Sequence, residues 1–204
     1  MKARDPYVAW VAASVGSGAL VAVLINFAGS SLLSVAFLAL VPALILSPIV
    51  AMFDGDPLLW ILTTLLGVAI TFVTTYLMFL ALFAGLGALL PTLAPGTRSA
   101  PGWTLPVVAA SACFIGAFPL GVLQRYALPA VRGAWSFPIA TMFGAAALSP
   151  LVLGIIGAPV ESTPLVGALG GLGYGLATAT AVGRAFAHQS RGPQPQPPVS
   201  RPKL

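Results

Sequence analysis

The feature that most constrains this sequence is the spacing of its charged residues. Five long stretches contain no charge at all: 6–53, 57–97, 99–124, 133–160 and 162–183. Each is longer than the roughly 20 apolar residues with which a helix crosses a hydrocarbon core. The pattern therefore predicts a chain that crosses a membrane several times.

Composition supports this prediction and excludes other classes. Hydrophobic residues make up 58% of the 204 residues and charged residues only 6%, whereas a soluble domain has about 25% charged residues. A soluble globular domain, a disordered chain and a nucleic-acid-binding module are excluded, so we expect no nucleic acid partner. A transmembrane β-barrel would alternate apolar and polar residues, but these apolar runs are continuous. They indicate helices.

We predict an all-α, polytopic bundle of six transmembrane helices in residues 1–187. A proline-rich basic tail follows in 188–204. The range 58–90 has neither charge nor proline over about 50 Å of helix, and we expect one long helix there rather than two short ones. The predicted spans are 7–27, 32–53, 58–83, 103–123, 136–157 and 165–186.

Orientation follows from the bias of Lys and Arg toward cytoplasmic loops. With the N-terminus inside, eight of the nine basic residues lie inside and only Arg98 lies outside. Both termini are therefore predicted to be cytoplasmic, in a prokaryotic-type inner (plasma) membrane. Two short helices in 58–90 would reverse this bias. In the preferred orientation the cytoplasmic tail serves either as a solvated end near anionic lipid or as a docking strip for a partner.

The inventory of reactive side chains argues against catalysis. Cys113 is the only cysteine and His188 the only histidine, and His188 follows the last predicted span. All four acidic residues stand at span boundaries. We interpret the segment 54–57 as a turn in which Asp56 caps the next helix, with Pro57 at its first position. No catalytic group, metal or cofactor is predicted, although a bound lipid fits such a chain.

Small residues recur every four positions in the last span. Such a ridge lets another helix approach closely, which is a main source of association between helices in lipid. It would serve packing within the bundle or between subunits. The ridge consists of Gly167, Gly171, Gly175, Ala179 and Gly183.

Prolines fall inside three spans, at Pro42, Pro48, Pro119 and Pro150. Each removes a backbone hydrogen bond, and broken helices often build substrate sites in transporters. The segment 43–50 also matches 145–152 at five of eight positions. These matches are compatible with an inverted repeat of three spans per half, but the shared residues are abundant here and chance is the alternative.

Few polar residues occur within the spans. Threonines on one face of the third span could bond to neighbouring helices or line a pore. Gln124, Arg125 and Arg132 are interpreted as a basic inner rim, either as ordinary anchoring or as a pocket for a lipid headgroup. The candidates for polar positions in the interior are Asn26, Thr64, Thr71, Thr75, Tyr76 and Tyr174.

These observations favour a non-catalytic membrane protein, an accessory or scaffold subunit that associates with other membrane subunits or with itself. The alternative is a small transporter or channel for a neutral or lipid-like solute, with broken helices at Pro48 and Pro150. No motif specific to a known family is present.

Overall fold

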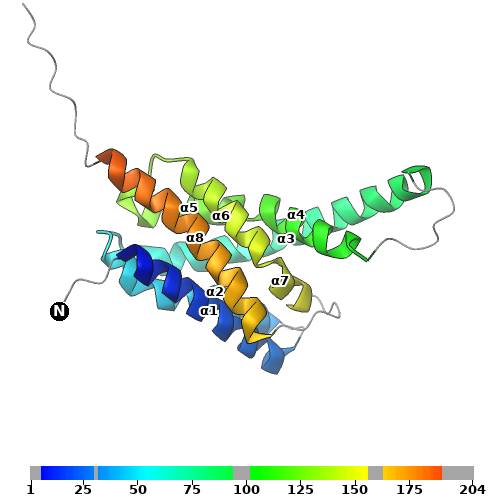
Figure 1. Cartoon of the computed structure of the whole chain (residues 1–204), viewed down its shortest axis with the longest axis horizontal. Coiled ribbons are helices and arrows are strands. Elements are labelled where there is room, and N and C mark those ends of the chain that lie inside the picture. Colours follow the sequence, from blue (N-terminus) through cyan, green and yellow to red (C-terminus); the bar gives the residue numbers. More distant parts are fainter. Residues whose placement is uncertain (1–5, 30–31, 94–101, 156–162, 190–204) are drawn as a thin grey trace, which may run out of the picture.

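A computed structural model describes residues 6–29, 32–93, 102–155 and 163–189 of the chain (Figure 1). Within these ranges the regular structure is entirely helical, so the predicted all-α bundle is confirmed. Two short 3₁₀ turns, Arg125–Ala127 and Pro129–Val131, follow α5. The α-helices are α1 (Pro6–Ala28), α2 (Leu32–Ala51), α3 (Pro57–Leu93), α4 (Thr104–Gly116), α5 (Phe118–Gln124), α6 (Ser136–Ala147), α7 (Ser149–Ile155) and α8 (Pro164–Gln189).

Five stretches of helix are long and apolar enough to cross a membrane, and α4 with α5 counts as one of them. Helices α6 and α7, with 12 and 7 residues, are each too short to cross a membrane alone and pass the same test only as a pair. They are bent by 57° at their junction. If this pair is one span, the total is the six that the sequence predicts. Helix α8 continues to Gln189, slightly past the predicted end of the membrane domain, and the rest of the tail lies outside the described residues.

The helices form a closed ring. Each packs against its neighbours along the chain, in the order α1, α2, α3, α4 with α5, α6 with α7, and α8. The last helix, α8, then packs against α1 in the most extensive helix–helix contact of the structure. The ring encloses a central space to which every span contributes side chains.

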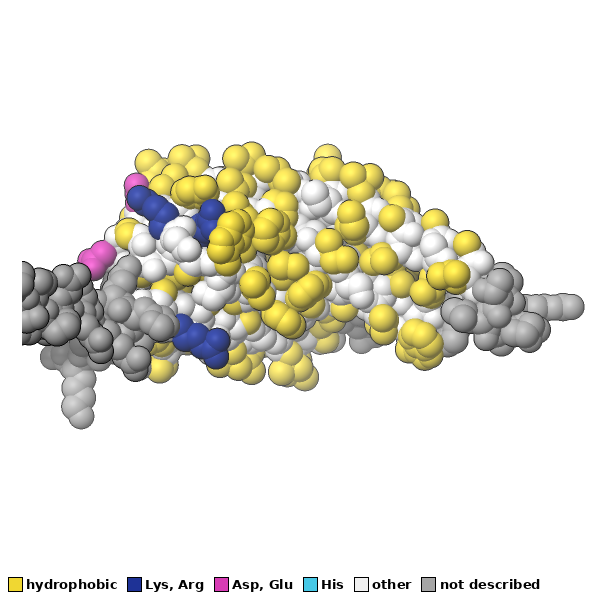
Figure 2. All heavy atoms as spheres, turned by 90° about the horizontal axis from the view of Figure 1, so that it is seen from above, with side chains coloured by type: hydrophobic (Ala, Val, Ile, Leu, Met, Phe, Trp, Pro, Cys, Tyr) yellow, Lys and Arg dark blue, Asp and Glu magenta, His cyan; other side chains and the backbone are white. Residues whose placement is uncertain are grey.

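Charged side chains gather at one end of the bundle, and apolar side chains cover the rest of the face seen in Figure 2. The charged residues in the described ranges are Asp54, Asp56, Arg125, Arg132 and Arg184, at helix ends or in the turns between helices. The loops before α3 and after α5 and the end of α8 therefore share one side of the bundle. This agrees with the predicted alternation of the spans, while the inside–outside orientation stays a prediction.

An aromatic core lies between this charged end and the central space. Trp10, Phe53 and Trp60 are almost fully buried, and Trp10 makes edge-on contacts with the other two rings. The Trp10 Nε1 group donates a hydrogen bond of 2.9 Å to Thr178 Oγ1 on α8. Helix α3 begins here as the sequence predicts, because Asp56 Oδ1 accepts hydrogen bonds from the backbone N–H groups of the first turn.

Helix α3 is one continuous helix of 37 residues, as we expected for 58–90. At about 1.5 Å per residue it is about 55 Å long, and its second half extends past the other helices in Figure 1. Glycines can kink a helix, and this range contains Gly85 and Gly87 in its second half. Both glycines lie within the helix and face open space.

The expectation of broken helices is correct at two prolines and wrong at two. Helix α2 runs without interruption through Pro42 and Pro48. Proline has a helix-compatible φ, so its cost is mainly the carbonyl it leaves free four residues earlier. For Pro48 that carbonyl belongs to Leu44, and the Ser47 hydroxyl donates a hydrogen bond of 2.9 Å to it.

The other two prolines do stand at breaks. Pro150 follows the junction at Leu148, where α6 and α7 bend, and Pro119 follows the one-residue interruption at Ala117 between α4 and α5. The matching Leu-Ser-Pro segments thus have different shapes, straight in α2 and bent at α7. The inverted repeat stays a prediction.

Candidate functional site

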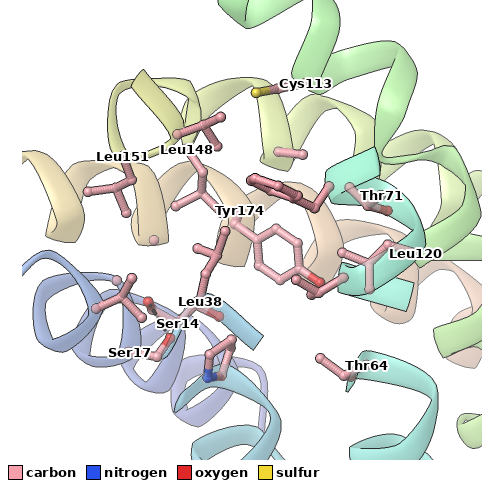
Figure 3. A pocket seen from close by; sticks show the side chains of 18 of the residues that line it. Ser14, Ser17, Leu38, Thr64, Thr71, Cys113, Leu120, Leu148, Leu151 and Tyr174 are labelled. Carbon is pink, nitrogen blue, oxygen red and sulfur yellow. Dashed lines mark hydrogen bonds between the residues drawn. The ribbon is translucent and has the colours of Figure 1, made fainter. Parts of the chain in front are cut away.

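A cavity of about 110 Å³ lies at the centre of the ring (Figure 3). All the α-helices contribute to its wall, among them α1 through Ser14, α2 through Leu38, and α8 through Tyr174. The exposed wall is almost entirely carbon. This is the site to which the topology brings residues from most of the chain, so it is the main candidate for a binding site.

Gln124 joins three helices at this cavity. Its Nε2 donates a hydrogen bond of 3.0 Å to Thr64 Oγ1 on α3, and its Oε1 accepts one of 3.0 Å from the Tyr174 hydroxyl on α8. Gln124 and Thr64 are 2% exposed and Tyr174 is 8% exposed. Because buried polar groups need partners, these three side chains satisfy one another and present little polar surface to the cavity.

This arrangement corrects the prediction for Gln124. It does not belong to a basic rim, because its side chain turns into the interior, where an amide is tolerated only when it is hydrogen-bonded. Sequence reasoning placed it at the rim because it directly precedes Arg125. Thr64 and Tyr174, two of the predicted interior polar residues, both form a hydrogen bond with Gln124. Their separation in sequence does not reveal this arrangement.

Two further hydroxyls at the wall bond to their own helix. Ser14 Oγ donates to the Trp10 carbonyl at 2.9 Å, and Ser17 Oγ donates to the Ser14 carbonyl at 3.0 Å. Thr71 differs: its buried Oγ1 has no hydrogen-bond partner in the described part of the chain. Thr75 also lines the cavity, so the threonines of one α3 face meet at this wall as the helical spacing indicates.

A second, smaller cavity of about 20 Å³ adjoins the first. The two share three wall residues, Phe72, Thr75 and Val152. The smaller cavity is otherwise lined by Ala109 and by residues farther along α3, including Tyr76, which is 50% exposed. The pair therefore extends from the centre of the ring toward the outer surface of α3.

The α1–α8 contact forms one side of the central cavity. A methyl group added at Gly18 of α1 would overlap the Gly167 carbonyl oxygen, and one added at Gly171 of α8 would overlap the Ser14 carbonyl oxygen. A methyl group at Gly175 would lie 2.8 Å from the Ser14 Cβ. The two backbones approach so closely that only glycine fits at Gly18 and Gly171.

The remaining candidates lie away from this contact or at its edge. Ala179 is buried in the aromatic core, and the nearest atom to a methyl group at Gly183 would be Tyr7 Cε1, at 3.5 Å. Asn26 is exposed near the end of α1 and does not line the cavity. Among the prolines, Pro42 lines it.

The two arginines of the predicted rim lie at the charged end. The Arg125 guanidinium carbon lies 4.5 Å from the centre of the Trp135 ring, a cation–π geometry. The Arg132 Nη2 group donates a hydrogen bond of 3.1 Å to the Tyr126 carbonyl. Arg125 is thus held by aromatic side chains, and Arg132 stabilises the turn after α5.

Sequence reasoning missed part of this site. The apolar wall residues Phe72, Leu148 and Val152 have no feature that distinguishes them from other residues of the spans. Pro150 is the one nearby feature of the sequence that indicates an unusual position. Leu148 and Val152 lie on either side of it, and both line the cavity.

Comparisons with protein-family models, curated proteins and solved structures found no match to this chain. The interpretation of function therefore depends on the geometry alone.

Proposed function

We propose that this chain is a non-catalytic subunit of a membrane complex, which holds a helix of another membrane protein against the second half of α3. The observation that carries the proposal is the surface of residues 76–89. No side chain in this segment is buried, and most are apolar. Leu77, Leu80, Phe83 and Leu89 are each between 46% and 56% exposed.

Length supports a protein partner over lipid alone. Helix α3 is about 55 Å long, whereas a hydrocarbon core is about 30 Å thick. Helices α1 and α2, with 23 and 20 residues, match that thickness. Lipid tails can cover only part of an apolar helix of this length, and tilt shortens its reach by a limited amount. A partner helix would cover the remainder.

The close contacts of α8 within the bundle also support this proposal. Gly167, Gly171 and Gly175 face α1 within the ring. In this proposal the small residues of α8 hold the bundle together, and α3 provides the surface for association. The proline-rich tail is a further candidate for partner contact.

Site-specific photo-crosslinking in native membranes tests this proposal. A photoreactive residue at Leu80 on α3, 46% exposed, is expected to give one protein adduct of defined mass. The matched control is Leu44 on α2, 56% exposed, which should react with lipid only. The variant Phe83→Ala should reduce co-purification of the same partner in mild detergent. A monomer without adducts at Leu80 contradicts the proposal, and an adduct with a second copy replaces it with self-association.

A small transporter or channel for a neutral or lipid-like solute is the second candidate. The central cavity and the bend at Leu148 favour it, because broken helices around a central site are common in transporters. Vesicles containing the protein and a fluorescent phospholipid provide a test. If the protein moves lipid between leaflets, an impermeant reductant should quench nearly all the fluorescence rather than about half. Quenching equal to that of protein-free vesicles excludes lipid transfer.

A further inference from the structure

We infer that the central cavity binds one acyl chain of a membrane phospholipid, which enters from the bilayer between α3 and α7. The inference concerns a ligand that stays bound to the bundle. It depends neither on a partner at α3 nor on transport.

The chemistry of the wall points to hydrocarbon. Its polar side chains are paired with one another or with their own helix, as for Gln124 with Tyr174 and for Ser14 with the Trp10 carbonyl. Water needs two to four polar partners to occupy a buried site, and this wall offers mainly Thr71 Oγ1. An ion or a polar solute would lose its hydration without replacement. An aliphatic chain has no hydration to lose on entering, so only its ordering opposes binding.

The size also fits a chain segment. An apolar cavity of about 150 Å³ stays dry and binds benzene. The central cavity, at about 110 Å³, is somewhat smaller. It therefore has room for on the order of four or five chain carbons, by proportion to that example.

The shape selects an elongated ligand over a compact one. The smaller cavity continues the central one past Phe72, Thr75 and Val152 toward the exposed side chain of Tyr76. Helices α3 and α7 make little direct contact where this passage runs between them. The bend at Leu148 tilts α7 by 57° relative to α6, and Leu148 and Val152 beside this bend line the central cavity.

The position of the passage identifies the source of the chain. Phe72 and Tyr76 lie 16 and 20 residues along α3 from the charged turn at Asp56, or about four and a half to five and a half turns. That distance, about 25–30 Å, places the passage in the leaflet away from Arg125. Acyl chains surround the helices there, and a phospholipid can place one chain in the cavity while its headgroup stays at the membrane surface.

The test uses the full chain and one substitution in the passage. Val152→Trp fills the shared wall, and the matched control Val73→Trp adds the same bulk on α3 at a side chain that is 57% exposed. Native mass spectrometry after purification in mild detergent should find one phospholipid retained by the wild type and by Val73→Trp, and none by Val152→Trp. Retention by Val152→Trp, or by no variant, overturns the inference.

A second measurement needs no variant. Cys113 lines the cavity and is the only cysteine of the chain. A small methanethiosulfonate should label it in delipidated protein, and added phosphatidylcholine at ten times its dissociation constant should slow labelling about elevenfold by simple occupancy. Oleate serves as the comparison. Protection by oleate alone, or by neither lipid, contradicts a phospholipid occupant.

Discussion

The Tyr174 hydroxyl lies 3.0 Å from Gln124 Oε1, and this hydrogen bond joins α8 to α5 across 50 residues of sequence. Gln124 extends the connection to Thr64 on α3. Three spans of the ring thus share one buried polar contact beside an otherwise apolar cavity. Polar contacts of this kind fix the rotation of helices that hydrocarbon packing alone would leave less defined.

Replacing Gln124, which bonds to both other residues, should lower the free energy of unfolding more than replacing Tyr174. Tyr174→Phe deletes one hydrogen bond and is expected to lower the free energy of unfolding by about 0.5–1.5 kcal/mol. Gln124→Leu leaves two buried hydroxyls without this partner and should cost about 1–3 kcal/mol. Thermal unfolding in detergent measures both, with a thiol-reactive dye that detects Cys113, 3% exposed in the folded chain. Equal effects of the two variants would contradict a central role for Gln124.

The α1–α8 contact predicts a sharp difference between two glycines that are two positions apart. Gly18→Val would force the valine against the Gly167 carbonyl and should destabilise the fold by about 1–3 kcal/mol, the usual cost of overpacking. Gly16→Val should change stability little, because nothing lies within 4 Å of a methyl group there. The same dye assay compares the two variants. If both melt at the wild-type temperature, α1 and α8 do not approach as closely as described.

Ser47 is expected to stabilise the fold only because Pro48 leaves the Leu44 carbonyl without its backbone hydrogen bond. Ser47→Ala removes the donor to the Leu44 carbonyl and should cost about 1 kcal/mol in a setting where water cannot replace it. In a Pro48→Ala background the restored backbone N–H should take over that carbonyl, so the serine substitution should then have little effect. An effect of the same size in both backgrounds would show that the serine acts in another way.

Topology can be tested with introduced cysteines in a Cys113→Ala background. A membrane-impermeant maleimide should label Arg98→Cys from outside intact cells, and Arg132→Cys only after the membrane is opened. Both predictions follow from the bias of basic residues toward the cytoplasm. Labelling of Arg98→Cys only after opening would reverse the orientation.

Much of the architecture is predictable because lipid imposes a simple rule on the chain. Backbone groups must be satisfied within each span, so the charge-free stretches give helix positions within a few residues, as for α1 and α8. The cap at Asp56 is local chemistry and is likewise predictable.

What the sequence does not predict depends on contacts between distant helices. Pro48 and Pro150 stand in segments that share five of eight residues, yet only the second lies at a bend. Gln124 and Arg125 are adjacent, yet one enters the interior and the other stacks on Trp135. The cavity forms because the helices together do not fill the centre of the ring, and the sequence of no single helix predicts it.

The closure of the ring by α8 onto α1 also has a consequence for synthesis. Among the described helices α1 is synthesised before the others and α8 after them, so the most extensive helix contact joins the two ends of the described bundle. Until α8 is inserted, the glycine face of α1 has no native partner. During this interval the face of α1 that later packs against α8 is exposed in the membrane. Mispairing or binding by a membrane chaperone can then compete with completion of the fold.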